Sequence, residues 1–192
     1  MDPRIVNPSN NLSKCNLANL TESIEAIVAQ EKTPFLIETS PEQFLAAYFT
    51  YKALLLDASV LIIPFAKGGP KREVLLEDGR KKLVLAMKTG VPFVLYLGQV
   101  TIEHADFKTK LCKKEVFPSD IFQQAGMKLK GPAHAPRYKA LFKEDELVQG
   151  QAIIKEGFCV VVLSSLSAYD YVDKLSASIP LGYMTPLYVE KD

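Results

Sequence analysis

Four hydroxyl side chains that follow two apolar segments of the chain could hold a ligand. Thr39 and Ser40 come after TPFLIE, and Ser164 and Ser165 come after FCVVVL. Apolar segments of this length are typical of strands buried on both faces of a parallel sheet. Because ligands of such sheets bind at the carboxyl ends of the strands, we interpret these four residues as candidates for cofactor binding. Serine also simply ends strands, so the pattern names no particular cofactor and none is predicted.

Three ionisable side chains beyond another apolar segment could exchange protons. Glu103, His104 and Asp106 lie just after VPFVLYLG, and carboxylate and imidazole groups are common general acids and bases. The second histidine, His134, lies between prolines with no carboxylate close by in the sequence. We interpret both histidines as surface residues and predict no catalytic residue.

The cysteines show no metal-binding or nucleophilic pattern. Cys15, Cys112 and Cys159 are widely spaced, without a CxxC pair, and no GxSxG motif surrounds a serine. Zinc sites and hydrolase nucleophiles carry such motifs. We therefore predict no metal site, and a reducing compartment such as the cytoplasm is the simplest setting for three thiols.

The motifs that nucleotide hydrolysis requires are missing from the sequence. The nearest phosphate-loop candidate, AKGGPKRE at Ala66 to Glu73, places Pro70 where an amide donor is needed and lacks the GK[ST] ending. The segment VPFVLYLGQ ends without the acid that would hold magnesium. Both features favour a protein that is not an enzyme.

Strand and helix patterns alternate along the chain and would position these residues. Helices are expected after Asn16 with Thr21 as N-cap, over Pro41 to Ala53 with Ser40 as N-cap, over Lys71 to Thr89 with a break permitted at Gly79, and over Tyr169 to Leu175. Strands are expected in TPFLIETS, LLLDASVLIIPF, VPFVLYLG, FCVVVL and MTPLYVEK. Since parallel neighbours need crossover helices, the alternation predicts a three-layer α/β domain with a mostly parallel sheet.

The chain's size and charge limit its organisation and its partners. Residues 1–15 are expected to be a flexible arm, and residues 16–192 a single domain in which 107–150 form an insertion or lid. Lys and Arg total 23 against 22 Asp and Glu, so no general positive field favours nucleic acid. The apolar segments are too short to cross a membrane. We expect protein partners in the cytoplasm.

Three segments in order resemble the motor region of the dynein heavy chain. TPFLIETSPEQF resembles a strand and turn of that region, with Pro34, Leu36, Ile37, Pro41 and Gln43 in place. KKLVLAMKTGVPFVLYLG resembles its helix, glycine turn and strand, and the segment from FCVVVL to LYVE resembles a later strand with a serine-rich tip. The match spans roughly Thr33 to Glu190, with a largely unmatched middle.

The resemblance implies a degenerate, non-hydrolysing AAA+ module or an orphan relative of one. Such a module has a P-loop NTPase, Rossmann-like core, here without a phosphate loop. Ser164 and Ser165 match the place of the family's first sensor residue, whereas Thr39 or Ser40 replaces the aspartate of its first turn. Microtubule or ciliary machinery would then be the partner, and the cilium or cytoskeleton the location.

Three functions remain open on these grounds. The first is a catalytically inactive AAA+-like scaffold or protein-interaction domain. The second is a nucleotide-binding sensor without hydrolysis, which would need free backbone amides near Thr39 to Gln43. The third is a small-molecule enzyme whose cleft at the carboxyl edge of the sheet is lined by Glu38, Glu103, Ser164 or Ser165.

Overall fold

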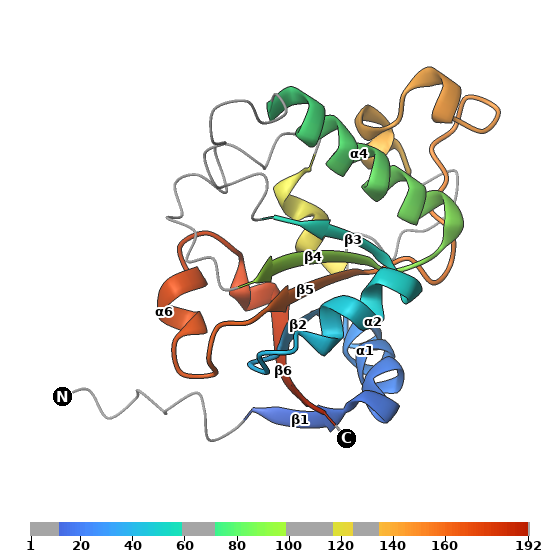
Figure 1. The fold of residues 1–192 in the computed structure, drawn as a ribbon. Helices are drawn as coiled ribbons and strands as arrows, with labels where there is room; N and C mark the ends of the chain where they lie inside the picture. The colour runs from blue at the N-terminus through green and yellow to red at the C-terminus, as the bar shows by residue number, and fades with distance from the viewer. Residues whose placement is uncertain (1–11, 59–71, 99–116, 125–134, 192) are drawn as a thin grey trace.

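The computed structural model describes residues 12–58, 72–98, 117–124 and 135–191, which are coloured in Figure 1. Within them, six strands form one sheet in the order β1-β6-β2-β5-β4-β3, and every neighbouring pair is parallel. The strands are β1 Ser13–Asn16, β2 Thr33–Ile37, β3 Leu54–Asp57, β4 Phe93–Gly98, β5 Val160–Ser164 and β6 Met184–Glu190. The predicted α/β fold with a parallel sheet is therefore confirmed.

Helices cover both faces of the sheet. Helices α1 (Leu20–Ala29) and α2 (Phe44–Lys52) pack on one face, against the side chains of Leu36, Val161 and Leu163. The opposite face packs against α4 (Arg72–Thr89), α6 (Tyr171–Leu175) and the 3₁₀ turns η4 (Ser119–Phe122) and η5 (Ala135–Leu141). Figure 1 shows α4 and α2 on opposite sides of the strands. The domain thus has three layers.

The direction of the crossovers defines a special point in the sheet. The connections through α1 and α2 run along the sheet in one direction over one face, whereas those through α4 and α6 run in the other direction over the opposite face. The chain therefore leaves the neighbouring strands β2 and β5 toward opposite faces. Such a topological switch point is where ligands of open α/β sheets bind.

Two expected helix starts were wrong. Helix α2 begins at Phe44 and not at Pro41, because Gln43 has left-handed backbone geometry with φ of 50° and interrupts the helix. Thr21 is not an N-cap, since α1 already begins at Leu20. Helix α4, in contrast, continues unbroken through Gly79.

Part of the expected flexible arm is a strand. Ser13 to Cys15 belong to β1, which pairs with Leu187 to Glu190 of β6 and so satisfies backbone groups along that edge. Ser13 to Cys15 are therefore not part of a flexible arm, and residues 1–11 lie outside the described part of the chain.

The segment expected to be an insertion or lid supplies core residues where it is described. Phe117, Phe122 and Leu141 are at most 1% exposed and pack on the face covered by α4. They belong to the layer that covers the sheet, as part of the crossover from β4 to β5. A separate insertion would not contribute such side chains to the main core.

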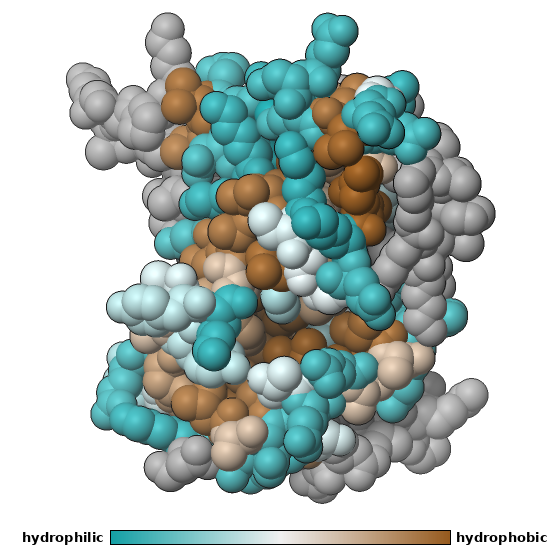
Figure 2. Space-filling view, turned by 90° about the vertical axis from the view of Figure 1, so that its right-hand side faces the viewer, coloured by the Kyte–Doolittle hydropathy of each residue, from teal (hydrophilic) through white to brown (hydrophobic). Residues whose placement is uncertain are grey.

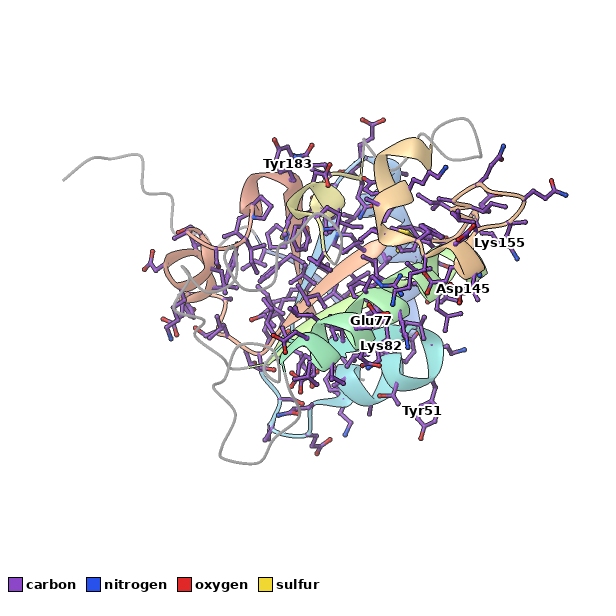
Figure 3. All side chains as sticks on the ribbon, turned by 90° about the horizontal axis from the view of Figure 1, so that it is seen from above. Tyr51, Glu77, Lys82, Asp145, Lys155 and Tyr183 are labelled. Atoms are coloured by element: carbon purple, nitrogen blue, oxygen red, sulfur yellow. The ribbon has the colours of Figure 1, made fainter. Side chains whose placement is uncertain are left out.

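A buried arginine fastens this crossover to α4. The guanidinium of Arg80 donates two hydrogen bonds to the carboxylate of Glu77 (2.8 Å each) and two to that of Glu146 in η6 (Glu144–Glu146; 2.6 and 2.9 Å). Figure 3 shows Glu77 and Asp145, the neighbour of Glu146, in the same region. The Arg80 guanidinium lowers the pKa of Glu77 to about 2 and also lowers that of Glu146. These paired charges join two segments that are distant in sequence.

Candidate functional site

The turns after β2 and β5 begin side by side at the switch point. Ile37 lies beside Ser164 in the sheet, and the backbone N–H of Glu38 donates to the carbonyl oxygen of Ser164 at 3.0 Å. Thr39, Ser40 and Ser165 belong to these two turns, and Ser164 is the last residue of β5. The sequence pattern therefore led to one place in the structure from two distant segments.

A buried carboxylate occupies the N-terminus of α2 at this place. Glu38 is 2% exposed. Its Oε1 accepts hydrogen bonds from the hydroxyl of Ser40 (2.7 Å) and the N–H of Phe44 (2.8 Å), and its Oε2 accepts one from the N–H of Leu45 (2.9 Å). These two N–H groups are the first of the helix, where the backbone dipoles attract negative charge. The chain thus places its own anion where an α/β nucleotide-binding protein would hold phosphate.

The predicted hydroxyls mostly serve the turns themselves. Ser40 donates to Glu38, and the hydroxyl of Thr39 is 2.7 Å from that of Tyr188 on β6. The hydroxyl oxygen of Ser164 accepts from the backbone N–H of Leu166 at 3.2 Å, and the residue is fully buried. Ser165 donates its backbone N–H to the carbonyl oxygen of Gly98 at 2.9 Å. These contacts hold the two turns in shape.

Other candidates from the sequence are not placed by the structure. Glu103, His104 and Asp106, as well as His134 and most of Ala66 to Glu73, lie outside the described residues. Within the described ranges, no group of three or more His, Cys, Asp or Glu side chains could hold a metal ion. None of the helices described there is long and apolar enough to span a bilayer.

A concave site, which the sequence did not predict, lies at the opposite edge of the sheet. A groove of about 570 Å³ opens between α1 and α2 and reaches the residues that precede β4 and β5. Figure 2 views this edge, with apolar surface around a hollow near the centre. Its lining comprises Thr21, Ile24, Glu25, Val28, Ala29, Tyr48, Phe49, Lys52, Pro92, Gln124, Gly157, Phe158 and Cys159.

The walls and mouth of this groove carry a few polar groups. The hydroxyls of Thr21 on α1 and Tyr48 on α2 lie 3.3 Å apart and connect the two walls. Glu25 and Lys52 are exposed and supply one charge of each sign. Beyond the groove, Tyr51 is 88% exposed and points into solvent (Figure 3). No sequence motif indicated this site, because five separate segments contribute to it.

Comparisons with known proteins identify no relative of this chain. A function must therefore be argued from the geometry. No protein-family model matches the chain, and neither a curated protein nor a solved structure matches it. The resemblance to the dynein heavy chain stays a prediction.

Proposed function

We propose that this chain is a catalytically inactive, AAA+-like domain that works by binding other proteins. The observation that carries the proposal is the carboxylate of Glu38, which is buried at the switch point and accepts hydrogen bonds from the first amides of α2. A nucleotide-binding module would need those amides for its phosphates.

The occupied helix terminus opposes nucleotide sensing as well as hydrolysis. A phosphate could reach the N–H groups of Phe44 and Leu45 only if Glu38 left them. The displaced carboxylate would then be a buried charge beside a second anion, and both desolvation and repulsion between like charges make this state costly. The sensor alternative requires free amides near Thr39 to Gln43, and in that segment the backbone N–H of Gln43 already donates to the carbonyl oxygen of Ser40 at 3.3 Å.

The AAA+ part of the proposal rests on the resemblance together with the sheet. The resemblance puts Thr39 and Ser40 in the family's first turn and Ser164 and Ser165 at its first sensor position. Their strands, β2 and β5, are hydrogen-bonded neighbours, as cooperation of those two positions on one ligand would require. We infer that the core kept this arrangement while its ligand groups became structural. Cytoplasmic, ciliary or cytoskeletal partners follow from the same resemblance.

A nucleotide titration tests the inactive state. The purified protein would be heated with ATP, ADP or GTP, with and without magnesium, and its melting temperature recorded. A ligand at one hundred times its Kd would add about 2.7 kcal/mol to the stability of the folded state, which raises the melting temperature by several degrees. We expect no saturable rise at millimolar nucleotide. A saturable rise would overturn the proposal.

Sedimentation with microtubules tests the partner class. We expect the protein to pellet with polymerised tubulin in a saturable manner, and to stay in the supernatant when tubulin is absent. If the protein stays in the supernatant with polymer, the microtubule partner is wrong. The nucleotide titration tests independently whether the domain is catalytically inactive and binds no nucleotide.

A further inference from the structure

The groove between α1 and α2 has the dimensions and lining of a small-molecule site. Its volume of about 570 Å³ falls within the roughly 300–1,000 Å³ of typical ligand pockets. Aromatic and aliphatic side chains form most of its surface, including Tyr48, Phe49 and Phe158. It lies at the amino edge of the sheet, away from Glu38 and the switch point.

One largely buried amide side chain, that of Gln124, lines this groove. Gln124 is 3% exposed and lines the groove. Its Nε2 donates to the hydroxyl oxygen of Thr33 and to the carbonyl oxygen of Val160, both at 3.2 Å. A backbone carbonyl can only accept a hydrogen bond, so the bond to Val160 fixes which end of the amide is nitrogen. The Gln124 oxygen is therefore the other end of the amide and takes part in neither bond.

No described residue donates a hydrogen bond to the Gln124 oxygen. Gln124 Oε1 is not one of the fully buried polar atoms that lack a partner, so it keeps accessible surface through which it can accept a hydrogen bond. A molecule in the groove that carries an N–H group could donate a hydrogen bond to this oxygen. The amide is already fixed in orientation by its two bonds, so little freedom is lost on binding.

We propose that this groove binds an uncharged aromatic molecule whose N–H group donates a hydrogen bond to Gln124 Oε1. The rings of Tyr48, Phe49 and Phe158 match flat aromatic surfaces. The opposite charges of Glu25 and Lys52 among the lining residues favour no net ligand charge. This site is independent of the proposed protein-binding function.

Indole and 1-methylindole form a matched pair of probes. They share one aromatic shape, but the methyl group removes the N–H donor from the second. Ligand-observed NMR with the full chain would give both affinities. We expect indole to bind and 1-methylindole to bind roughly 3- to 10-fold more weakly, as expected for one neutral hydrogen bond. Equal affinities, or no binding of either probe, would overturn the proposal.

Two tryptophan substitutions locate the binding site without changing the buried amide. Ala29→Trp adds a large side chain at an exposed wall residue of the groove, and we expect it to abolish indole binding. Ala26→Trp adds the same side chain at an exposed residue of α1 that does not line the groove, and binding should persist. Melting temperatures would show that both variants fold. Retained binding in Ala29→Trp, or equal loss in both, would place the probe elsewhere and contradict the proposal.

Discussion

At the residue scale, Glu38 shows how a functional candidate can become a structural group. The sequence indicated Glu38 as one lining residue of a cleft, because it follows a buried strand directly. In the structure its carboxylate instead caps α2 from six and seven residues away. Sequence rules place helix caps at the residue next to the helix, so this long-range cap could not be predicted. It depends on the left-handed turn at Gln43.

Replacing Glu38 should expose an anion site at α2. We expect Glu38→Ala to lower the free energy of unfolding by about 2 kcal/mol, since the variant loses hydrogen bonds to a charged cap. Added sulfate should stabilise this variant more than the wild type, because the freed amides bind anions. Urea unfolding with and without sulfate measures both effects.

Glu42→Ala is the matched control for that substitution. Glu42 forms an exposed ion pair with Lys191, and such pairs contribute about 0–1 kcal/mol. We expect a small loss of stability and a sulfate response equal to that of the wild type. If Glu38→Ala behaves in the same way as Glu42→Ala, the capping role assigned to Glu38 is wrong.

At the element scale, the buried strands were predicted well, whereas the edge strand β1 and the starts of helices α1 and α2 were not. β2, β4 and β5 are continuous apolar runs, and burial on both faces requires that composition. Gly79 does not break α4, where its missing side chain lets the helix approach Leu56, 3.2 Å from the place of a Cβ. β1 has the sequence SKCN, which carries no strand pattern. It becomes a strand because β6 offers an unpaired edge.

Acid should loosen the contact between α4 and η6. Glu77 has its pKa lowered from 4.5 to about 2 by Arg80, and that of Glu146 is lowered by the same guanidinium. Because the folded-state pKa values are depressed, the stabilisation is complete above about pH 4.5 and is lost as the pH falls toward 2. Urea unfolding between pH 7 and pH 3 should show the decline.

Arg80→Leu should remove most of that acid sensitivity. We expect this variant to be less stable at pH 7 by about 1–3 kcal/mol, since the carboxylates of Glu77 and Glu146 lose their partner but are partly exposed, and to show a flatter decline below pH 4.5. Lys82→Ala removes an exposed pair with Asp78 and should retain the wild-type pH dependence. If Arg80→Leu loses stability in acid as steeply as the wild type, the acid sensitivity comes from carboxylates other than Glu77 and Glu146.

The turn at Gly157 leaves no space for a side chain, whereas the turn at Gly150 does. Gly157 has φ of 89°, and a Cβ there would lie 2.4 Å from the carbonyl oxygen of Gly90. Gly150 has φ of 75° but no atom within 4 Å of such a Cβ. Gly150→Ala should cost about 1–2 kcal/mol from backbone strain alone, and Gly157→Ala clearly more. If urea unfolding shows the same loss of stability for both variants, the turns at Gly90 and Gly157 can move apart without a loss of free energy.

At the scale of the whole molecule, topology decided which sites the sequence could reveal. The turns after β2 and β5 were found because each follows a recognisable strand and parallel strands end at one edge. The groove was not found, because Gln124, Pro92 and Phe158 belong to segments whose meeting depends on the complete crossover pattern. An acceptor such as Gln124 Oε1 also has no signature in sequence, since its availability depends on where the amide nitrogen is bonded.

In the strand order, β1 is the outermost strand and covers one edge of β6. β1 pairs with Leu187 to Glu190, and Lys14 adds an ion pair of 2.6 Å to Glu190. Without β1, that part of β6 would present unpaired backbone groups, which recruit strands from other molecules. Deleting residues 1–16 should therefore lower the stability to urea and produce concentration-dependent self-association in analytical ultracentrifugation. Deleting residues 1–11 keeps β1 and should change neither property. If both truncated chains keep the association state and the stability of the full chain, the edge is protected by other parts of the chain, and β1 contributes little to the fold.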